Sequence, residues 1–271
     1  MKKKLLKRKA RPGGRRWRGW TGIRYTNSES PEVSVIIPVV NERATIAQVI
    51  RQAYRVHPKT EVIIVANGST DGTRELAENL GAKVIWIAHK VGHDVGRSIG
   101  AAAAKGNILL FTDGDIVIRA ELLIPLVNAV AGGIDVALNR YTGPTDKTRV
   151  HGVILAKHSL NIALSRPDLG GASLTTIPHA LSRNALQQIG AEQLAVPPKA
   201  LAAAVYQGLT VKAVQYIEVG KTNPRRRRQF RVDPLEPLII GDHLEAMDWY
   251  LENTNRRANM TDLWRDRDIV R

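Results

Sequence analysis

Two aspartates separated by one glycine follow directly after a short apolar run. The run covers residues 108–111, has the composition of a buried strand, and leads into Thr112, Asp113, Gly114 and Asp115. Two carboxylates at the end of a strand can hold a hard divalent cation that also takes phosphate oxygens. An ordinary acidic turn has the same composition, so the motif indicates a metal site only if a sheet places it at a ligand-binding edge.

The chain around this motif alternates between apolar β-branched runs and stretches with helical spacing. We expect strands at residues 33–38, 61–66, 83–87 and 108–112, and helices at 44–54, 74–80 and 95–104. Strand, helix and strand with short links imply parallel strands and right-handed crossovers. Ligands bind beyond the carboxyl ends of such strands. The loops at residues 38–42, 66–72 and 113–115 should therefore lie at one edge.

The later part of the chain is less periodic. We expect a strand at residues 134–139, a helix within 150–165, a loop at Gly170 and Gly171, a helix at 200–207, a strand at 211–219 and an amphipathic helix at 237–251. The 271 residues contain no cysteine and no apolar run of about 18 residues, so a disulfide framework and a transmembrane span are not expected.

Positive charge is concentrated at the N-terminus. The formal net charge is +15, and residues 1–24 carry 11 lysines and arginines before the first acid, Glu29. Such a segment cannot bury enough apolar surface to fold alone. Its charge suits a solvated tail or an anionic membrane face, where Trp17 and Trp20 would favour the interface. Nucleic acid is a third, unlikely partner, because a basic patch does not read which polymer carries the phosphate.

Three ordered motifs resemble family 2 glycosyltransferases of the GT-A fold. They span residues 33–42, 65–73 and 106–115, and the resemblance covers roughly residues 33–130, with a weaker continuation to about 219. It implies an α/β fold with a doubly wound, mostly parallel sheet and a Rossmann-like nucleotide-binding half. We expect a basic, disordered arm at residues 1–30, the GT-A domain at 31–222, and a basic loop with a C-terminal helical extension at 223–271.

The same resemblance assigns roles to particular residues. It implies that Asp115 binds a divalent metal, Mn²⁺ or Mg²⁺, that Asp113 supports it near the ribose and diphosphate, and that both are catalytic. The metal would neutralise the leaving diphosphate. The expected nucleotide-binding residues are Pro38, Glu42, Asn67, Asp71, Arg97 and Asp113. For Pro38 a strand terminator is an equally good interpretation.

The sequence departs from the family pattern at two places. The family usually has an acid where this chain has Asn67, and an amide offers both an acceptor and a donor, so UDP is not assured. Inverting members carry an acidic pair, the general base, where this chain has Pro197 and Pro198. Three explanations stay open: an acceptor that is already ionised, a retaining enzyme, or a catalytically inactive chain.

The segment after Pro198 is faintly similar to retaining sugar-phosphoglycerate synthases. Those enzymes use a histidine as an extra metal ligand where this chain has Thr222 and Asn223, and His243 could substitute for it. A histidine beside an apolar helical stripe is more often a packed residue. His179 lies in the stretch that faces the acceptor in the family and is a candidate acceptor-site residue.

Four consecutive arginines, residues 225–228, follow the last expected strand. They could close over an anionic donor or acceptor, or form a solvated basic loop. The sequence thus predicts a metal-dependent transfer of sugar from a nucleoside diphosphate to an acceptor. The acceptor could bear a phosphate or be associated with a membrane. The expected location is the cytoplasm, including the cytoplasmic face of the inner membrane. The alternatives are a nucleotidyltransferase, whose glycine-rich basic loop is missing after the first strand, and a non-catalytic nucleotide-sugar or anionic-polymer binding protein.

Overall fold

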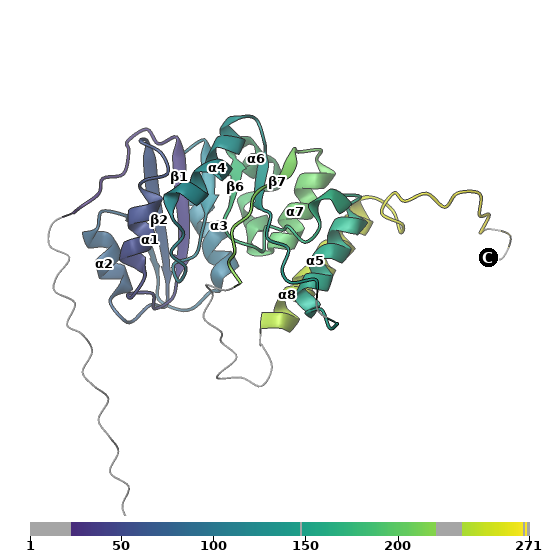
Figure 1. The fold of residues 1–271 in the computed structure, drawn as a ribbon, viewed down its shortest axis with the longest axis horizontal. Helices are drawn as coiled ribbons and strands as arrows, with labels where there is room; N and C mark the ends of the chain where they lie inside the picture. The colour runs from purple at the N-terminus through teal and green to yellow at the C-terminus, as the bar shows by residue number, and fades with distance from the viewer. Residues whose placement is uncertain (1–22, 147, 221–234, 268, 270–271) are drawn as a thin grey trace, which may run out of the picture.

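The computed structural model describes residues 23–146, 148–220, 235–267 and 269. In this part of the chain, seven strands form one mixed sheet in the order β3-β2-β1-β4-β6-β5-β7, with helices on both faces (Figure 1). The predicted α/β fold is therefore confirmed.

The first half of the sheet is entirely parallel. The strands β1 (Val33–Val39), β2 (Thr60–Asn67), β3 (Lys83–Ile87) and β4 (Ile108–Phe111) alternate with the helices α1 (Ile46–Ala53), α2 (Thr73–Asn79) and α3 (His93–Ala103). All seven residues of β1 are buried, because helices cover the sheet on both sides. Val35 and Ile37 enter the core on one face, whereas Ile36 enters the core on the other.

The second half of the sheet reverses direction once. β6 (His179–Ser182) is antiparallel to β4 and to β5 (Val136–Asn139), and β5 is parallel to β7 (Val211–Gln215). Because β6 runs against β4, His179 pairs with Phe111. The start of β6 therefore lies at the edge where β4 ends, directly beside the Asp113 loop.

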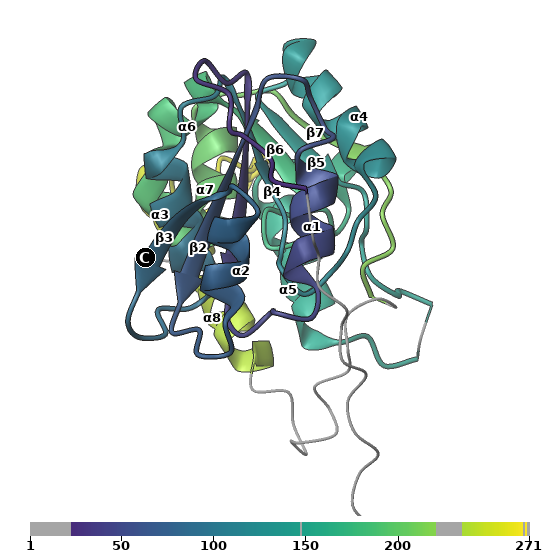
Figure 2. The ribbon, with the colours of Figure 1, turned by 90° about the vertical axis from the view of Figure 1, so that its left-hand side faces the viewer.

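The helices form two layers. Buried residues of α1, α2 and α4 (Ala120–Ala131) cover one face of the sheet. Those of α3, α5 (Gly152–Ala163), α6 (Arg183–Ile189), α7 (Pro197–Tyr206) and α8 (Leu235–Asn253) cover the other, an arrangement visible in Figure 2. Two short 3₁₀ helices, η1 (Pro167–Leu169) and η2 (Ala191–Ala195), complete the second layer. Since Ala246 and Tyr250 of α8 are buried in the same core as α7, the C-terminal helix is integral to this layer.

Two glycines let α3 approach the sheet closely. A Cβ atom on Gly100 would lie 2.4 Å from Ile36 Cγ2, and one on Gly96 would lie 3.0 Å from Pro38 Cβ. Because a larger residue at Gly100 would push α3 away from β1, these glycines fix the distance between the helix and the strand that ends at the predicted site.

The Gly100→Ala variant tests this close approach. We expect it to lower the free energy of unfolding by about 1 to 3 kcal/mol, since the added methyl overpacks the contact with Ile36. The control is Gly241→Ala on α8, where an added Cβ meets nothing within 4 Å. There the better helix propensity of alanine should stabilise by up to about 1 kcal/mol. Urea unfolding measures both, and equal stabilisation by the two changes would contradict the close packing of α3.

Candidate functional site

The carboxyl ends of β1, β2 and β4 meet at one edge of the sheet, together with the start of β6. The loops that follow these strands contain most of the residues predicted from the sequence. The residues at this edge are Pro38, Glu42, Asn67, Asp71, Asp113, Asp115 and His179. The elements therefore bring the three polar motifs together as expected for a doubly wound sheet.

Pro38 lies inside β1, which continues to Val39, so the expected strand end at Pro38 was one residue short. The backbone N–H of Thr112 donates to Ile36 O, so Ile36 faces β4 and Pro38, two residues on, faces the same way. β4 ends at Phe111, which pairs with Ile36. Because no residue of β4 stands opposite Pro38, its missing N–H costs no hydrogen bond on that side, while Val65 of β2 pairs with it on the other.

Hydrogen bonds join the loop after β1 to the loop after β2. Asn41 N–H donates to Ser69 Oγ at 3.1 Å, and Arg43 N–H donates to Asp71 Oδ2 at 3.1 Å. Burial alone would raise the pKa of Asp71, but the hydrogen bonds from Thr73 and Arg43 outweigh it and lower that pKa. Asp71 is thus an ionised brace that holds the two loops in register.

The Asp113 loop packs directly against the loop after β1. Thr45 Oγ1 donates to Gly114 O at 2.6 Å, and a Cβ on Gly114 would lie 2.5 Å from Val39 Cγ1 and 3.5 Å from Glu42 Cβ. A residue larger than glycine would separate these loops. The glycine between the two aspartates therefore allows the Asp113 loop to lie directly against Val39 and Glu42.

A buried arginine connects α3 to this acidic loop. Arg97 has a side chain that is 6% exposed, and it donates to Asp113 Oδ1 at 2.7 Å and forms an ion pair with Asp94 one turn earlier. Burial opposes its charge, yet Asp113 and Asp94 together raise the pKa of Arg97, so it stays a cation. The guanidinium of Arg97 therefore lies beside the Asp113 carboxylate. Its role near the donor phosphates remains a prediction.

Asn67 is fully buried, which bears on its predicted role in reading the nucleobase. Its amide nitrogen donates to Val39 O at 3.4 Å, and its amide oxygen accepts from Val91 N at 3.3 Å. The side chain ties β1 to the segment before α3. The geometry thus supports a bracing role, and contact with a base remains a prediction.

His179 is 1% exposed and lies beside Asp113 and Arg97. Its ring stacks on Phe111 with 5.0 Å between ring centroids, and Nδ1 lies 3.2 Å from Thr176 O. Burial, reinforced by the charge of Arg97, lowers the pKa of His179 to about 3. The imidazole is therefore neutral near pH 7 and shapes the expected acceptor side without adding charge.

His243 packs inside the second helical layer on α8. Its Nδ1 lies 2.7 Å from Ile239 O, and burial lowers its pKa to about 4. Within the described ranges, no three histidine, cysteine or acidic side chains gather as a metal-binding cluster, so His243 does not join Asp113 and Asp115. The structure places His243 as a packed residue. Thr222, Asn223 and the arginines at 225–228 lie outside the described residues.

Pro197 and Pro198 open α7 and are both buried. Proline suits the first turn of a helix, where backbone N–H groups have no partner within the helix. The first turn of α7 therefore carries no carboxylate. The structure therefore has prolines in the first turn of α7, where the resemblance led us to expect an acidic pair.

Two charged residues near the site, Asp94 and Lys157, were not predicted from the sequence. Asp94 stands three residues before Arg97 on α3, a spacing that pairs side chains on a helix and could have been noticed. Lys157 lies on α5, distant in sequence from every motif, and its Nζ donates to Thr176 Oγ1 at 2.5 Å. Only tertiary packing brings it to this edge.

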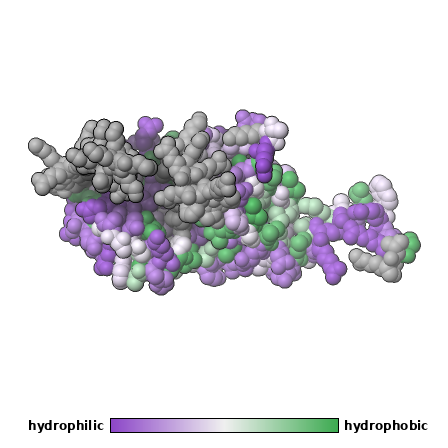
Figure 3. Space-filling model, turned by 90° about the horizontal axis from the view of Figure 1, so that it is seen from below, coloured by the Kyte–Doolittle hydropathy of each residue, from purple (hydrophilic) through white to green (hydrophobic). Residues whose placement is uncertain are grey.

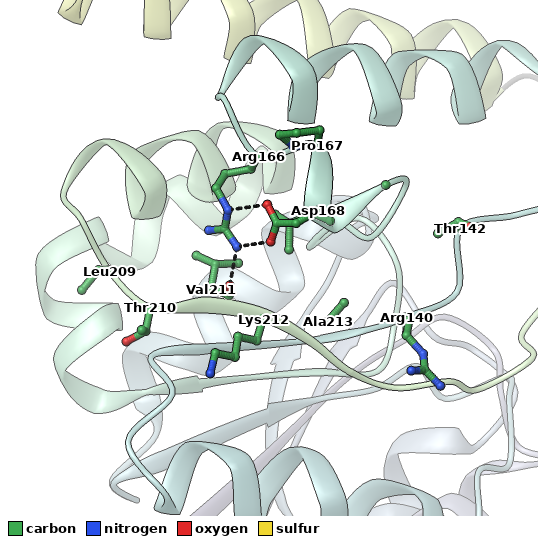
Figure 4. A pocket seen from close by; sticks show the side chains of 12 residues that line it. Arg140, Thr142, Arg166, Pro167, Asp168, Leu209, Thr210, Val211, Lys212 and Ala213 are labelled. Atoms are coloured by element: carbon green, nitrogen blue, oxygen red, sulfur yellow. Dashed lines mark hydrogen bonds and ion pairs between the residues drawn. The ribbon is translucent and has the colours of Figure 1, made fainter.

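An open groove of about 610 Å³ lies elsewhere, along the edge strand β7. Figure 4 shows Arg166 paired with the neighbouring Asp168, and Arg166 also donates to Val211 O at 2.8 Å. None of the lining residues belongs to the predicted donor site. We therefore interpret this groove as part of the sheet edge. Arg166 donates a hydrogen bond to the carbonyl of Val211, which the edge strand β7 would otherwise leave without a partner.

The mixed α/β sheet, with acidic residues at the ends of its strands, is the architecture of GT-A glycosyltransferases. The structure matches glucosyl-3-phosphoglycerate synthase from Mycobacterium tuberculosis, solved with Mn²⁺, UDP-glucose and phosphoglyceric acid, with a TM-score of 0.57 and 22% identity over 80% of each chain. At that identity the match supports the fold. The model of glycosyl transferase family 2 matches residues 34–188, and the chain belongs to this family.

Curated relatives match a shorter region. Glycosyltransferase AglE of Haloferax volcanii is 34% identical over 117 residues, which cover 40% of this chain and 38% of that protein. Polyprenol monophosphomannose synthase of Mycolicibacterium smegmatis is 30% identical over 117 residues, covering 40% of this chain and 44% of the relative. The aligned region thus spans less than half the length of either relative. These relatives are glycosyltransferases, which agrees with the enzyme class predicted from the motifs.

Asp242 on α8 offers a test of how α8 meets this site. Burial, then the charges of Asp94 and Glu245, raise its pKa to about 6. Because the folded state holds this proton more tightly than the unfolded state, ionised Asp242 destabilises the fold above pH 6, and the penalty disappears below about pH 4. Asp242→Asn should therefore raise the melting temperature at pH 8 and leave it nearly unchanged at pH 4.

The matched control is Asp248→Asn, an exposed residue on the same helix. It should give no difference between the two pH values. A stabilisation by Asp242→Asn that is equal at pH 4 and pH 8 would contradict the proximity of Asp242 to Asp94.

Proposed function

We propose that the protein is a metal-dependent glycosyltransferase that moves a sugar from a nucleoside diphosphate to a phosphate-bearing acceptor. The observation that carries this proposal is the buried Arg97, paired with Asp113 at the strand end where Asp115 also lies. A cation and two carboxylates at the carboxyl edge of a parallel sheet suit a diphosphate and a divalent metal. The chain that matches in structure was solved with Mn²⁺ and UDP-glucose, which supports this choice.

The residues present fit a metal that needs few protein ligands. Asp113 Oδ1 accepts a hydrogen bond from Arg97 at 2.7 Å, which orients this carboxylate, and Asp115 follows two residues later as the carboxylate that would hold a cation. Mg²⁺ and Mn²⁺ commonly keep several waters and take one or two carboxylates plus substrate phosphates. When bound, such an ion would offset the negative charge that develops on the leaving diphosphate. Arg97 would orient Asp113, and the braced loops would hold the nucleoside.

The acceptor half of the proposal rests on the missing acid at α7. A hydroxyl acceptor needs a base to remove its proton, and the first turn of α7 begins with Pro197 and Pro198 instead. A phosphate acceptor is already ionised near neutral pH and needs no such base. Phosphate-bearing acceptors also occur among similar proteins, since phosphoglyceric acid is bound in the structural match.

Membrane association is a further element of this proposal. None of the described helices is long and apolar enough to cross a membrane. Exposed apolar side chains do occur on α5 and α8, at Leu155, Ile162, Leu238 and Leu244, and Figure 3 shows hydrophobic patches between hydrophilic ones on the face seen from below. Such patches can lie against a lipid surface. Most of the basic arm, residues 1–22, lies outside the described residues, so its contact with the cytoplasmic face of an inner membrane remains a prediction.

Thermal stabilisation by nucleotides tests the donor site. We expect one of UDP, GDP, dTDP or CDP to raise the melting temperature only when Mn²⁺ is present. At a hundred times its dissociation constant, that nucleotide should add about 2.7 kcal/mol to the free energy of unfolding. Asp115→Asn should abolish the metal-dependent part, and Asp146→Asn, an exposed aspartate outside the motifs, should not.

Stabilisation that is equal with and without metal, and unchanged in Asp115→Asn, would contradict the proposed site. If the donor site holds, a second assay distinguishes an enzyme from an inactive nucleotide-sugar binding protein. An enzyme should slowly hydrolyse the nucleotide sugar in a metal-dependent reaction, and a binding protein should not.

A further inference from the structure

Lys157 is a partly buried cation at the expected acceptor side of the site. It projects from α5 toward the segment before β6, where Nζ donates to Thr176 Oγ1 at 2.5 Å. Thr176 O in turn lies 3.2 Å from His179 Nδ1, and His179 stacks on Phe111, the residue two before Asp113. Lys157 is thus joined to the acidic loop through Thr176 and His179.

The charge of Lys157 is not balanced by the surrounding protein. None of the carboxylates in the described part of the chain forms an ion pair with it, and a neutral hydroxyl is the partner that Nζ contacts. Burial lowers its pKa to about 8, and the neighbouring His243 is a neutral imidazole near pH 7. Arg97, in contrast, is matched by two carboxylates. A partly buried ammonium whose contact is a neutral hydroxyl gains from an anionic partner, and an anionic ligand would supply one.

The rest of the acceptor side supplies no competing charge. His179 is neutral, and the first turn of α7 carries prolines. Lys199, on the same turn, is already paired with Glu245 at 3.1 Å. Among the described residues, Lys157 is therefore the cation that contacts Thr176 and forms no ion pair with a carboxylate.

We propose that Lys157, with Thr176, binds the phosphate of a phosphomonoester acceptor and thereby selects an anionic acceptor over a neutral one. This inference rests on the proposed function, because it names the acceptor contact of the same site. An ammonium with three donors can bridge Thr176 Oγ1 and a phosphate oxygen at once. The phosphate could belong to a small soluble metabolite or to a lipid, and the chemistry of recognition is the same for both.

The test compares phosphorylated and neutral ligands in matched pairs. The probes are inorganic phosphate, phosphoglyceric acid against glyceric acid, and farnesyl phosphate against farnesol in detergent, each titrated calorimetrically with and without Mn²⁺ and the stabilising nucleoside diphosphate. Wild type should prefer the phosphorylated member of at least one pair, and the pair that binds identifies a soluble or a lipid acceptor. Lys157→Met should lose roughly 10-fold or more of that phosphate affinity, as expected for a charge-assisted hydrogen bond.

Two further variants separate binding from folding. Lys157→Arg keeps the cation and should retain most of the preference, and Lys199→Met removes a paired lysine nearby and should leave the preference intact. Lys157→Met should still be stabilised by nucleotide and Mn²⁺ as wild type is, because the donor site does not include Lys157.

Three results would overturn the inference: no phosphate preference in wild type, an unchanged preference in Lys157→Met, or loss of nucleotide stabilisation in Lys157→Met, which would move Lys157 to the donor site. Failure of nucleotides to stabilise wild type would instead contradict the proposed function. The titrations without nucleotide would then still report whether Lys157 binds phosphate.

Discussion

The ion pairs of Arg97 are the interaction on which the site depends. A guanidinium that is 6% exposed needs carboxylate partners, and Asp94 and Asp113 supply them from the same helix and from the strand-end loop. This requirement fixes the orientation of Asp113 before any ligand binds. It also requires α3 to lie close to β1, which Gly96 and Gly100 allow. The position of one acidic side chain is therefore set by the packing of an entire helix on the sheet.

The reversal at β6 gives the site its second side. Because β6 runs antiparallel to β4, its first residue, His179, stands next to the end of β4, and Thr176 and Lys157 follow beside it. The parallel half contributes the braced loops and acids suited to a diphosphate. The second half contributes the neutral imidazole of His179 and the partly buried ammonium of Lys157. A donor and an acceptor would thus meet where two differently built halves of the sheet adjoin.

The sequence predicted the parallel half well, because buried strands and amphipathic helices of that half have strong periodicity and each polar loop follows a strand. It did not predict α4 or the antiparallel direction of β6, since a four-residue strand has no signal for direction. It overestimated the last strand, which ends at Gln215. The burial of Asn67 and His243, and the approach of Lys157 to Thr176, depend on tertiary packing and could not be derived from residue spacing.

Anomalous diffraction from crystals soaked with Mn²⁺ and the stabilising nucleoside diphosphate tests the central claim most directly. The account predicts a manganese peak next to the Asp115 carboxylate, bridging to the diphosphate, with Arg97 still bound to Asp113 and the nucleoside between the loops after β1 and β2. A manganese peak distant from Asp113 and Asp115, or a nucleotide bound in the groove beside β7, would contradict it.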